Sequence, residues 1–201
     1  MHLNINLLFI FFFYVLGSVP FALIIPKIFG YGDIRNTGSG NIGATNVLRM
    51  GNKYLAFSVL ISDMLKGLIP FIILSMYFDE IEILSKIFLC HFAILGHIFP
   101  IWLKFKGGKG VATYIGFLIG LSLYLGIIFI CIWLIIAFIS KYSSLSSLIS
   151  CLIAPIYFIF LTPYTFTGFF LFYIFLIIMH KHRENIKRLL NKSENKIKFN
   201  K

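Results

Sequence analysis

The chain has 201 residues, of which 59% are hydrophobic and 18% aromatic, and its mean hydropathy is +0.93. This balance is far from that of a soluble globular domain, so a lipid bilayer is the expected solvent. The formal net charge is +11, but the aromatic residues form long apolar runs instead of alternating with a basic patch, which argues against a nucleic-acid partner. We therefore predict an all-α polytopic membrane protein.

About 20 apolar residues cross the hydrocarbon core as a helix, and on that measure the chain has about seven transmembrane segments. They lie near residues 4–25, 54–77, 84–103, 110–123, 124–140, 145–161 and 164–180. No Lys or Arg precedes the first segment, so we interpret it as a retained span and not as a secretory signal peptide. Only Tyr124 and Gly126 separate the fourth segment from the fifth, and one continuous helix there would give six spans. Gly116 and Gly120 form a G-x-x-x-G step that predicts close helix packing.

The basic residues predict the orientation of the spans, because Lys and Arg near span ends mark the cytoplasmic side. With seven spans, the first, third and fifth loops and the basic tail 181–201 fall on one side and carry most of this charge. The opposite side has a short acidic loop at 79–82 and an uncharged turn at 162–163. We predict an outer N-terminus, a cytoplasmic C-terminus, and a cytoplasmic face on which any chemistry takes place.

The first loop, residues 33–49, is rich in glycine and polar residues. Its glycines fit a formal G-x-G-x-x-G pattern at Gly38, Gly40 and Gly43. A dinucleotide fold also needs a preceding strand and a βαβ unit, whereas this loop joins two apolar spans. Glycines can instead let backbone N–H groups converge on an anion, and Arg49 offers a planar fork suited to phosphate. Further neutral donors are Ser39, Asn41, Thr45 and Asn46. We therefore favour an anion site over a plain turn.

A second polar segment follows the third span and surrounds Lys109 with glycines. Its candidate phosphate-binding residues are Lys104, Gly107, Gly108, Lys109 and Gly110. The segment is not a P-loop, because that motif has Ser or Thr directly after the lysine and here Thr113 comes four positions later. A helix that begins near Gly110 would direct its N-terminal amides and dipole at the same anion. The segment therefore predicts a phosphate cradle and makes an ATPase a poor interpretation.

Several titratable residues lie inside the apolar segments. Asp63 and Lys66 are three residues apart, so they can pair on a helix, which lowers the cost of charge at hydrocarbon depth. We prefer a structural ion pair that supports the first loop over a transport role. His97 fits catalysis and a hydrogen bond between helices equally well, and His91 is interpreted as a packing residue. The cysteines are predicted to be free, packed thiols, and no metal-ligand spacing occurs.

The third polar segment follows the last span. His182 and Asn185 are three residues apart and share a face if the helix continues past the membrane. A basic helix held by anionic lipids explains the lysines of this tail. It does not explain the His and Asn pair, so we take both residues as catalytic candidates.

Three motifs in this order resemble the signature regions of the PlsY family of bacterial acyl-phosphate glycerol-3-phosphate acyltransferases. They are Gly-Ser-Gly-Asn-Ile-Gly-Ala-Thr-Asn at 38–46 with Arg49, Gly-His-Ile-Phe-Pro at 96–100 with Gly-Gly-Lys-Gly at 107–110, and His-x-x-Asn-Ile-x-Arg-Leu at 182–189 with Glu194. The resemblance covers nearly the whole chain, including 17–20, Asp63-x-x-Lys66-Gly and the loop from Ser144 to Ser147. At 191–194 the chain lacks the glycine that the family pattern has before its glutamate, and this departure affects only Glu194.

The resemblance implies one membrane acyltransferase domain over residues 1–201. Its reaction would move a fatty acyl group from acyl phosphate to the 1-hydroxyl of sn-glycerol 3-phosphate, giving lysophosphatidic acid and phosphate, with no cofactor, metal or acyl-CoA. It also implies a multi-pass protein of the bacterial inner membrane, with its active site facing the cytoplasm. Its expected partners are the two substrates, membrane lipids and, transiently, the enzyme that produces the acyl phosphate. No H-x-x-x-x-D box of other glycerolipid acyltransferases is present.

An acyl phosphate has a good leaving group, so positioning and charge stabilisation could lower the barrier without a covalent intermediate. We expect Arg49, Lys109 and the loop amides to hold the phosphates and Ser39 to orient them together with Asn41. We expect Asn185 and His182 to contact the glycerol phosphate, and either His182 or a substrate phosphate to take the proton. A Ser39 acyl-enzyme is a lesser alternative. The residues kept as structural or unassigned are Asp63, Lys66, His97, Ser144, Ser147 and Glu194.

Two rival functions remain. A small anion transporter would also have glycine-broken segments near charges, but it would be expected to show internal repeats and polar groups at midplane. The polar motifs here gather on one predicted face, and the halves of the chain do not resemble each other. A lipid-binding scaffold would explain the basic tail and leave the glycine loops without a role.

Overall fold

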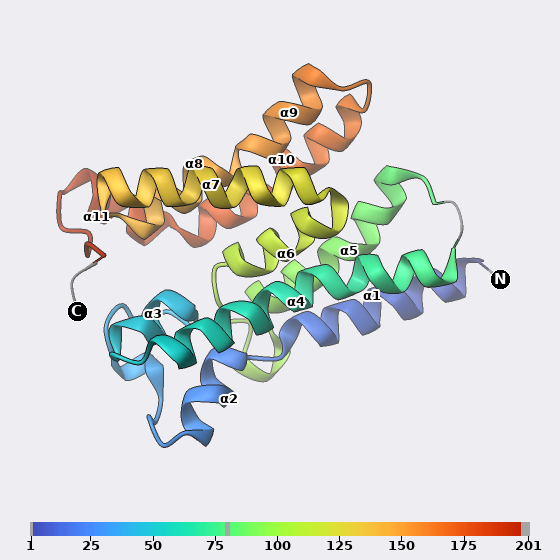
Figure 1. Ribbon diagram of the computed structural model, residues 1–201. Helices are drawn as coiled ribbons and strands as arrows, with labels where there is room; N and C mark the ends of the chain where they lie inside the picture. Colours follow the sequence, from blue (N-terminus) through green and yellow to red (C-terminus); the bar gives the residue numbers. More distant parts are fainter. Residues whose placement is uncertain (1, 79–80, 198–201) are drawn as a thin grey trace. The chain divides into compact units, whose positions relative to one another are not determined.

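A computed structural model of the chain describes residues 2–78 and 81–197, and all regular structure in these ranges is helical (Figure 1). The chain divides into two compact units, residues 1–121 and 122–201, and each is described by itself. Asp79 and Glu80 of the predicted outer loop and Lys198 of the basic tail lie outside the described residues.

Within residues 2–78 and 81–121, the first unit has six α-helices and two short 3-10 helices. These are α1 (His2–Ser18), α2 (Phe21–Ile28), η1 (Ile34–Asn36), α3 (Ala44–Arg49), α4 (Lys53–Tyr77), α5 (Ile83–Ile98), η2 (Ile101–Leu103) and α6 (Val111–Leu121). Pro20 follows the end of α1 and precedes α2, as expected of a residue that lacks an N–H and disfavours helix in the residue before it. At the resulting bend, the Val19 carbonyl accepts a hydrogen bond from the Lys66 side chain of α4.

Glycines let the helices of the first unit approach each other closely. A Cβ at Gly116 would overlap the Met64 carbonyl, and one at Gly120 would overlap the ring of Phe71. The predicted close packing at the G-x-x-x-G step is therefore confirmed, with α4 as the partner of α6. Gly96 of α5 meets the backbone of α1 in the same way, at the Tyr14 carbonyl.

The second unit contains α7 (Leu123–Ser140), α8 (Ser143–Cys151), α9 (Ile153–Leu161), α10 (Thr165–Lys181) and α11 (Arg183–Leu190). Helix α7 packs on α8, where the indole N–H of Trp133 donates to Ser147 Oγ at 3.0 Å. Helix α9 packs on α10, where a Cβ at Gly168 would overlap the side chain of Ile159. Figure 1 shows α11 continuing from α10 at an angle, and this places the polar tail beyond the apolar helix.

Within the described residues, four helical segments are long and apolar enough to span a membrane: 53–77, 83–103, 123–140 and 143–161. Two bent pairs raise the number to six if each is one span: α1 from Asn4 with α2, bent by 42°, and α10 with α11, bent by 64°. The predicted fourth span is α6, whose 11 residues fall short of the length that crosses the hydrocarbon core. Seven spans are thus not confirmed, and the orientation of the termini stays a prediction.

The long apolar run after residue 110 is broken, but not where the sequence suggested. Helix α6 ends at Leu121, and Ser122 is extended (φ −161°, ψ 121°) before α7 begins at Leu123. The predicted break at Tyr124 and Gly126 lies inside α7. The sequence signal failed because an extended serine has no strong local signature, unlike glycine or proline.

The buried thiols are Cys90 and Cys151, whereas Cys131 is exposed, so the prediction of packed cysteines is wrong for Cys131. Its exposure accompanies that of many large apolar side chains, among them Phe11, Tyr54, Phe138, Phe160 and Phe166. Exposure on this scale is rare for a soluble monomer. In contact with hydrocarbon it is the expected state of a helix surface.

Candidate active site

The glycine loop of the first unit is organised by one buried side chain, Asn46 of α3. Its Oδ1 accepts the backbone N–H of Ser39 at 2.9 Å and the Ser39 hydroxyl at 3.3 Å. Its Nδ2 donates to the carbonyls of Ile34 at 2.9 Å and Thr37 at 3.1 Å. Because Asn46 is 1% exposed and its amide serves the loop itself, the structure gives it a positioning role in place of the predicted direct contact with an anion.

Two of the loop glycines have a backbone conformation that favours glycine. Gly38 (φ 58°) and Gly40 (φ 67°) lie in the left-handed region, where a Cβ is unfavourable. Gly38 also lies beside Asn46 and Arg49, because an added Cβ would be 3.2 Å from Arg49 Cδ. The stem of Arg49 therefore lies next to the loop. Ser39 and Arg49 are exposed, and Asn41, Gly43 and Thr45 are half-buried.

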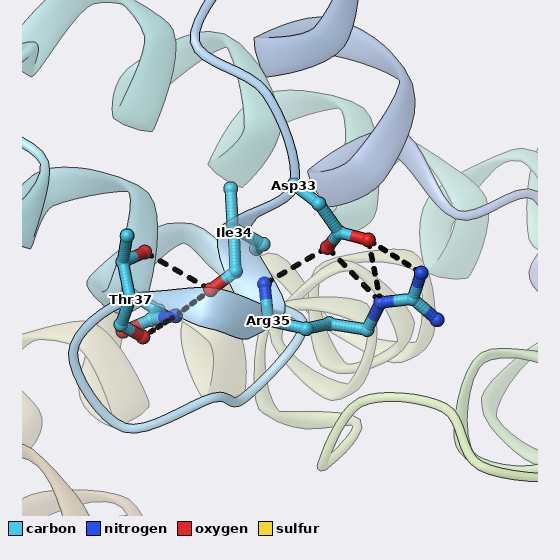
Figure 2. Close-up of polar contacts among 5 residues, drawn as sticks. Asp33, Ile34, Arg35 and Thr37 are labelled. Carbon is cyan, nitrogen blue, oxygen red and sulfur yellow. Dashed lines mark hydrogen bonds and ion pairs between the residues drawn. The ribbon is translucent and has the colours of Figure 1, made fainter.

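The first residues of the glycine loop, 33–37, are connected by hydrogen bonds and an ion pair, as Figure 2 shows. The Asp33 carboxylate accepts the backbone N–H of Arg35 at 2.9 Å and pairs with its guanidinium, with Nη2 2.5 Å from Oδ2. The Thr37 hydroxyl donates to the Ile34 carbonyl at 3.0 Å. The hydrogen bonds from Arg35 lower the pKa of Asp33. Since this ion pair is exposed, its contribution to stability is small.

The glycine–lysine loop, residues 104–110, turns back onto the end of α5. The backbone N–H groups of Gly107 and Gly108 donate to the carbonyls of Ile98 and His97, both at 3.2 Å. These two amides therefore cap α5, and the phosphate-binding role of the two glycines stays a prediction. Gly110 (φ 85°) stands directly before α6, so the predicted helix start is confirmed. Lys104 is exposed and Lys109 half-buried.

A buried charged cluster lies between α4, α5 and the α1–α2 bend. Lys66 Nζ lies 2.7 Å from Asp63 Oδ1, and both side chains are 2% exposed. The predicted ion pair is thus confirmed, but its backbone partner is the Val19 carbonyl, which accepts from Nζ at 2.6 Å. It therefore supports the bend, and its predicted support of the glycine loop stays a prediction. His97 joins the cluster, with Nδ1 3.3 Å from Lys66 Nζ.

A small pocket in the first unit brings parts of both loops to this cluster. It is lined by residues 17–22 and Ile42, by Gly107 and Gly108, and by the charged cluster. Ser39, Arg49 and Lys109 are not among the lining residues. One wall of the pocket, residues 17–22, was not predicted as part of a site. Its signal in the sequence was the Gly17-Ser-Val-Pro20 segment, whose proline marks the bend. Trp102 fixes this wall by donating its indole N–H to Ser18 Oγ at 2.8 Å.

The tail of the second unit presents His182 and Asn185 as buried residues. His182 Nδ1 lies 2.8 Å from the Ile178 carbonyl. A carbonyl can only accept, so Nδ1 carries the proton of the neutral ring and Nε2 is the atom able to take another. Asn185 Nδ2 donates to Glu194 Oε1 at 2.7 Å, so its amide is oriented by a carboxylate.

Glu194 is the centre of a hydrogen-bond network in the tail. Besides Asn185, it accepts the Ser144 hydroxyl at 3.0 Å and Arg188 Nε at 2.7 Å. Burial raises the pKa of Glu194, but the hydrogen bonds from Arg188, Asn185 and Ser144 outweigh it and lower the pKa overall. Arg188, which pairs with this carboxylate, was not among the predicted site residues, although its position within the 182–189 motif was available as a signal.

The missing family glycine before Glu194 is replaced by a lysine in the glycine-like conformation. Lys192 has φ 54°, and its N–H donates to the Leu189 carbonyl at 3.2 Å while Ser193 donates to Arg188 at 2.8 Å. The turn therefore forms without glycine. Ser147, left unassigned by the sequence, accepts from Trp133 of α7 and donates to the Ser143 carbonyl of α8.

Residues 7–192 match the family described as glycerol-3-phosphate acyltransferase. The chain belongs to this acyltransferase family. A glycerol-3-phosphate acyltransferase of Pelagibacter ubique is 48% identical over 186 residues, which are 92% of this chain and 94% of that protein. One from Bartonella henselae is 48% identical over 92% of this chain and 88% of its own length. The chain is thus an acyltransferase of phospholipid synthesis.

Two crystal structures of PlsY, an integral membrane glycerol 3-phosphate acyltransferase, are similar to the acyltransferase throughout. Its glycerol 3-phosphate form is 37% identical with a TM-score of 0.87, and 96% of each chain is covered. Its lysophosphatidic acid form is 36% identical with a TM-score of 0.85, covering 96% of this chain and 95% of that one. The acyltransferase is therefore an integral membrane protein with the PlsY fold. Among the described residues, no group of His, Cys, Asp and Glu is arranged to hold a metal ion.

Proposed function

We propose that this acyltransferase moves a fatty acyl group from acyl phosphate to the 1-hydroxyl of sn-glycerol 3-phosphate, releasing lysophosphatidic acid and phosphate. The observation that carries the proposal is the similarity over 96% of the chain to PlsY in its glycerol 3-phosphate and lysophosphatidic acid forms. These ligands are the acceptor and the product of such a transfer. A phosphate leaving group fits the concentration of anion-binding residue types in both loops of the first unit.

In this reaction the acceptor hydroxyl oxygen attacks the acyl carbonyl carbon, and the bond from that carbon to the phosphate oxygen breaks. The hydroxyl proton goes to a base, and the phosphate leaves with the bonding electron pair. Because the leaving group is already good, positioning and charge stabilisation can supply most of the rate enhancement. The reaction therefore does not need a covalent acyl-enzyme on Ser39.

We assign phosphate binding in the first unit to Arg49 and Lys109, with Ser39 as a neutral donor. Arg49 is exposed and its stem lies beside Gly38, so its guanidinium can offer two parallel N–H groups to a phosphate. Ser39 is exposed and its N–H is fixed by Asn46, so its hydroxyl, 3.3 Å from Asn46 Oδ1, would turn from Asn46 to donate to a phosphate. Asn41 and Thr45, both half-buried, are kept as further donors, and Lys104 as an exposed cation at the start of the second loop.

We assign the general base in the second unit to His182, acting through Nε2. The Ile178 carbonyl orients the ring at Nδ1, which is the arrangement by which a neighbouring acceptor sets the reactive nitrogen of a histidine. Asn185, oriented by Glu194, would contact the glycerol phosphate. A substrate phosphate remains the alternative acceptor for the proton.

We further propose that residues 1–201 form one acyltransferase domain of the bacterial inner membrane, with the reaction on the cytoplasmic face and the C-terminus in the cytoplasm. The clustering of Lys and Arg in alternate loops supports this orientation. The acyl phosphate would reach the enzyme within the membrane or by transient contact with the enzyme that makes it. Membrane lipids surround the exposed apolar helices.

The decisive experiment incubates the purified protein with acyl phosphate and glycerol 3-phosphate in the presence of a chelator and without CoA. We expect lysophosphatidic acid and one phosphate per acyl transfer. Acyl-CoA in place of acyl phosphate should give no product. If acyl phosphate yields no lysophosphatidic acid while acyl-CoA does, the proposed donor is wrong.

His182→Ala tests the base. General base catalysis contributes about 10²–10⁴-fold, so we expect kcat to fall by roughly that factor and the acidic limb of the pH–rate profile to disappear. His180→Ala is the matched control, because His180 is an exposed histidine two residues earlier, in the last turn of α10. An unchanged rate and profile in His182→Ala would assign the proton to a substrate phosphate.

A further inference from the structure

The ammonium group of Lys66 lies close to three groups, each from a different element of the first unit. Its Nζ lies 2.6 Å from the Val19 carbonyl at the α1–α2 bend, 2.7 Å from Asp63 Oδ1 on α4, and 3.3 Å from His97 Nδ1 on α5. An ammonium group has three N–H donors and no acceptor. Nζ thus donates to the Val19 carbonyl, pairs with the Asp63 carboxylate and faces His97 Nδ1, and the cluster joins the bend to both helices.

The contact with Lys66 decides where His97 carries its proton. A nitrogen that faces an ammonium group must accept, so Nδ1 is unprotonated. Asp63 Oδ1 is 3.7 Å from Nδ1, which is too long for a hydrogen bond that would hold a proton there. A neutral imidazole with a bare Nδ1 has its proton on Nε2. His97 is therefore a hydrogen-bond donor at the other end of its ring.

That other end faces the glycine–lysine loop. A Cβ at Gly108 would overlap His97 Nε2, and one at Gly107 would overlap the His97 carbonyl and Pro100. The same two residues donate their backbone N–H groups to His97 and Ile98. His97 thus controls the course of this loop through both its backbone and its ring, directly before Lys109. Only glycine leaves room for the imidazole at position 108.

We propose that Lys66, held by Asp63 and Val19, locks His97 as a neutral ring protonated at Nε2, and that this ring positions the Gly107–Gly108 backbone so that Lys109 is presented to phosphate. His97 is thus a positioning residue and not the base, and Asp63 with Lys66 sets its tautomer. The part that concerns Lys109 rests on the proposed function. The part that concerns the tautomer does not.

The tautomer is tested first, in the wild-type protein labelled with ¹⁵N-histidine and reconstituted in lipid. His97→Gln identifies the His97 signals by their loss. At neutral pH we expect an unprotonated Nδ1 and a protonated Nε2. A proton on Nδ1, or a doubly protonated ring, would overturn the proposal. In Lys66→Met the His97 signals should shift to a mixture of tautomers, and unchanged signals would remove Lys66 from the mechanism.

The positioning role is tested by comparing two amide substitutions. Glutamine can place its amide N–H near the Nε2 position, whereas asparagine can reach only the Nδ1 position. Lys109→Ala first identifies the phosphate substrate that Lys109 binds, by the rise in its KM. We expect His97→Asn to raise the KM for that same substrate about tenfold, equivalent to about 1.4 kcal/mol. Its kcat should stay within a few-fold of the wild-type value, and its pH profile should be unchanged. His97→Gln should recover most of the wild-type KM.

His91→Gln is the control, because His91 is a buried histidine of the same helix whose ring lies at the Phe88 carbonyl and outside the pocket. A loss of kcat by about 10²-fold or more with an altered pH profile in both His97 variants would make His97 a base and refute the proposal. Equal losses in both amide variants would reduce His97 to a packing residue. If the wild-type protein forms no lysophosphatidic acid, the proposed function fails while the ¹⁵N result still decides the tautomer.

Discussion

The glycine loop of the first unit and the tail of the second unit are each ordered by one side chain, but the two side chains differ in charge. Asn46 holds the glycine loop by neutral hydrogen bonds to Ser39, Ile34 and Thr37. Glu194 holds the tail by charged hydrogen bonds from Arg188, Asn185 and Ser144. A neutral centre keeps its bonds at any pH, whereas a carboxylate loses them when it is protonated. The two regions should therefore respond differently to substitution and to acid.

The largest effect is expected for Asn46. Replacing it by Ala removes the partner of the Ser39 N–H and hydroxyl and of two carbonyls, and each buried group left unpaired costs about 1–3 kcal/mol. Asn46→Asp should be as harmful, because it keeps the acceptor for Ser39 but turns a carboxylate oxygen toward two carbonyls. We expect both variants to lose more than about tenfold in kcat/KM.

The measurement for Asn46 is the acyl transfer rate together with thermal unfolding in detergent. Asn36→Ala is the matched control, since Asn36 is exposed in η1, and it should behave as the wild type. Wild-type activity in Asn46→Asp would show that the donated hydrogen bonds do not order the loop.

Glu194→Gln should have the next largest effect. Removing the carboxylate charge weakens the hydrogen bond from Arg188. The glutamine amide N–H also faces a donor, because Glu194 accepts from Arg188, Asn185 and Ser144. Together these changes should lower the free energy of unfolding by about 2–3 kcal/mol. The pKa of Glu194 is lower in the folded protein, so its stabilisation is present above the ordinary carboxyl pKa and is lost as the pH falls through the lowered value. The difference in stability between wild type and variant should therefore be largest at neutral pH and shrink in acid.

Thermal unfolding across a pH series measures this difference. Glu184→Gln is the control, because Glu184 is an exposed residue of α11 whose ion pairs with Arg183 and Lys187 are 3.8 and 3.5 Å long, and such pairs contribute little. A difference for Glu194→Gln that stays constant down to strong acid would contradict the charged network. A matching pH series on Asn46→Ala should show no such change.

The sequence predicted much of this molecule because its signals were local. Helical spans follow from apolar length, the Asp63–Lys66 pair from their spacing, and the start of α6 from Gly110. The sequence could not predict that the amides of Gly107 and Gly108 cap α5, because their acceptors depend on how the chain folds back. For the same reason the predicted phosphate contact of Asn46 became a contact with its own loop.

The tail illustrates the opposite case, in which a local departure had no structural consequence. The absence of glycine at 192 cast doubt on Glu194, yet Lys192 takes the left-handed conformation and Glu194 forms three hydrogen bonds. Tertiary contacts of the carboxylate outweigh the local cost of a non-glycine residue, which is about 1–2 kcal/mol. A motif residue can thus keep its position when its supporting glycine is replaced.

Lys192→Gly tests whether the turn before Glu194 is strained, and it has the smallest expected effect on stability. Glycine removes the strain of the left-handed conformation, about 1–2 kcal/mol, but it loses more conformational entropy on folding, which offsets about 0.5–1 kcal/mol. We expect a net stabilisation of up to about 1 kcal/mol and an unchanged acyl transfer rate. Lys187→Gly is the control, because it places glycine inside α11, where it should destabilise by about 1 kcal/mol. If Lys192→Gly destabilises the protein as much as Lys187→Gly does, the turn before Glu194 is not under strain, and the carboxylate holds the tail without opposing a local cost.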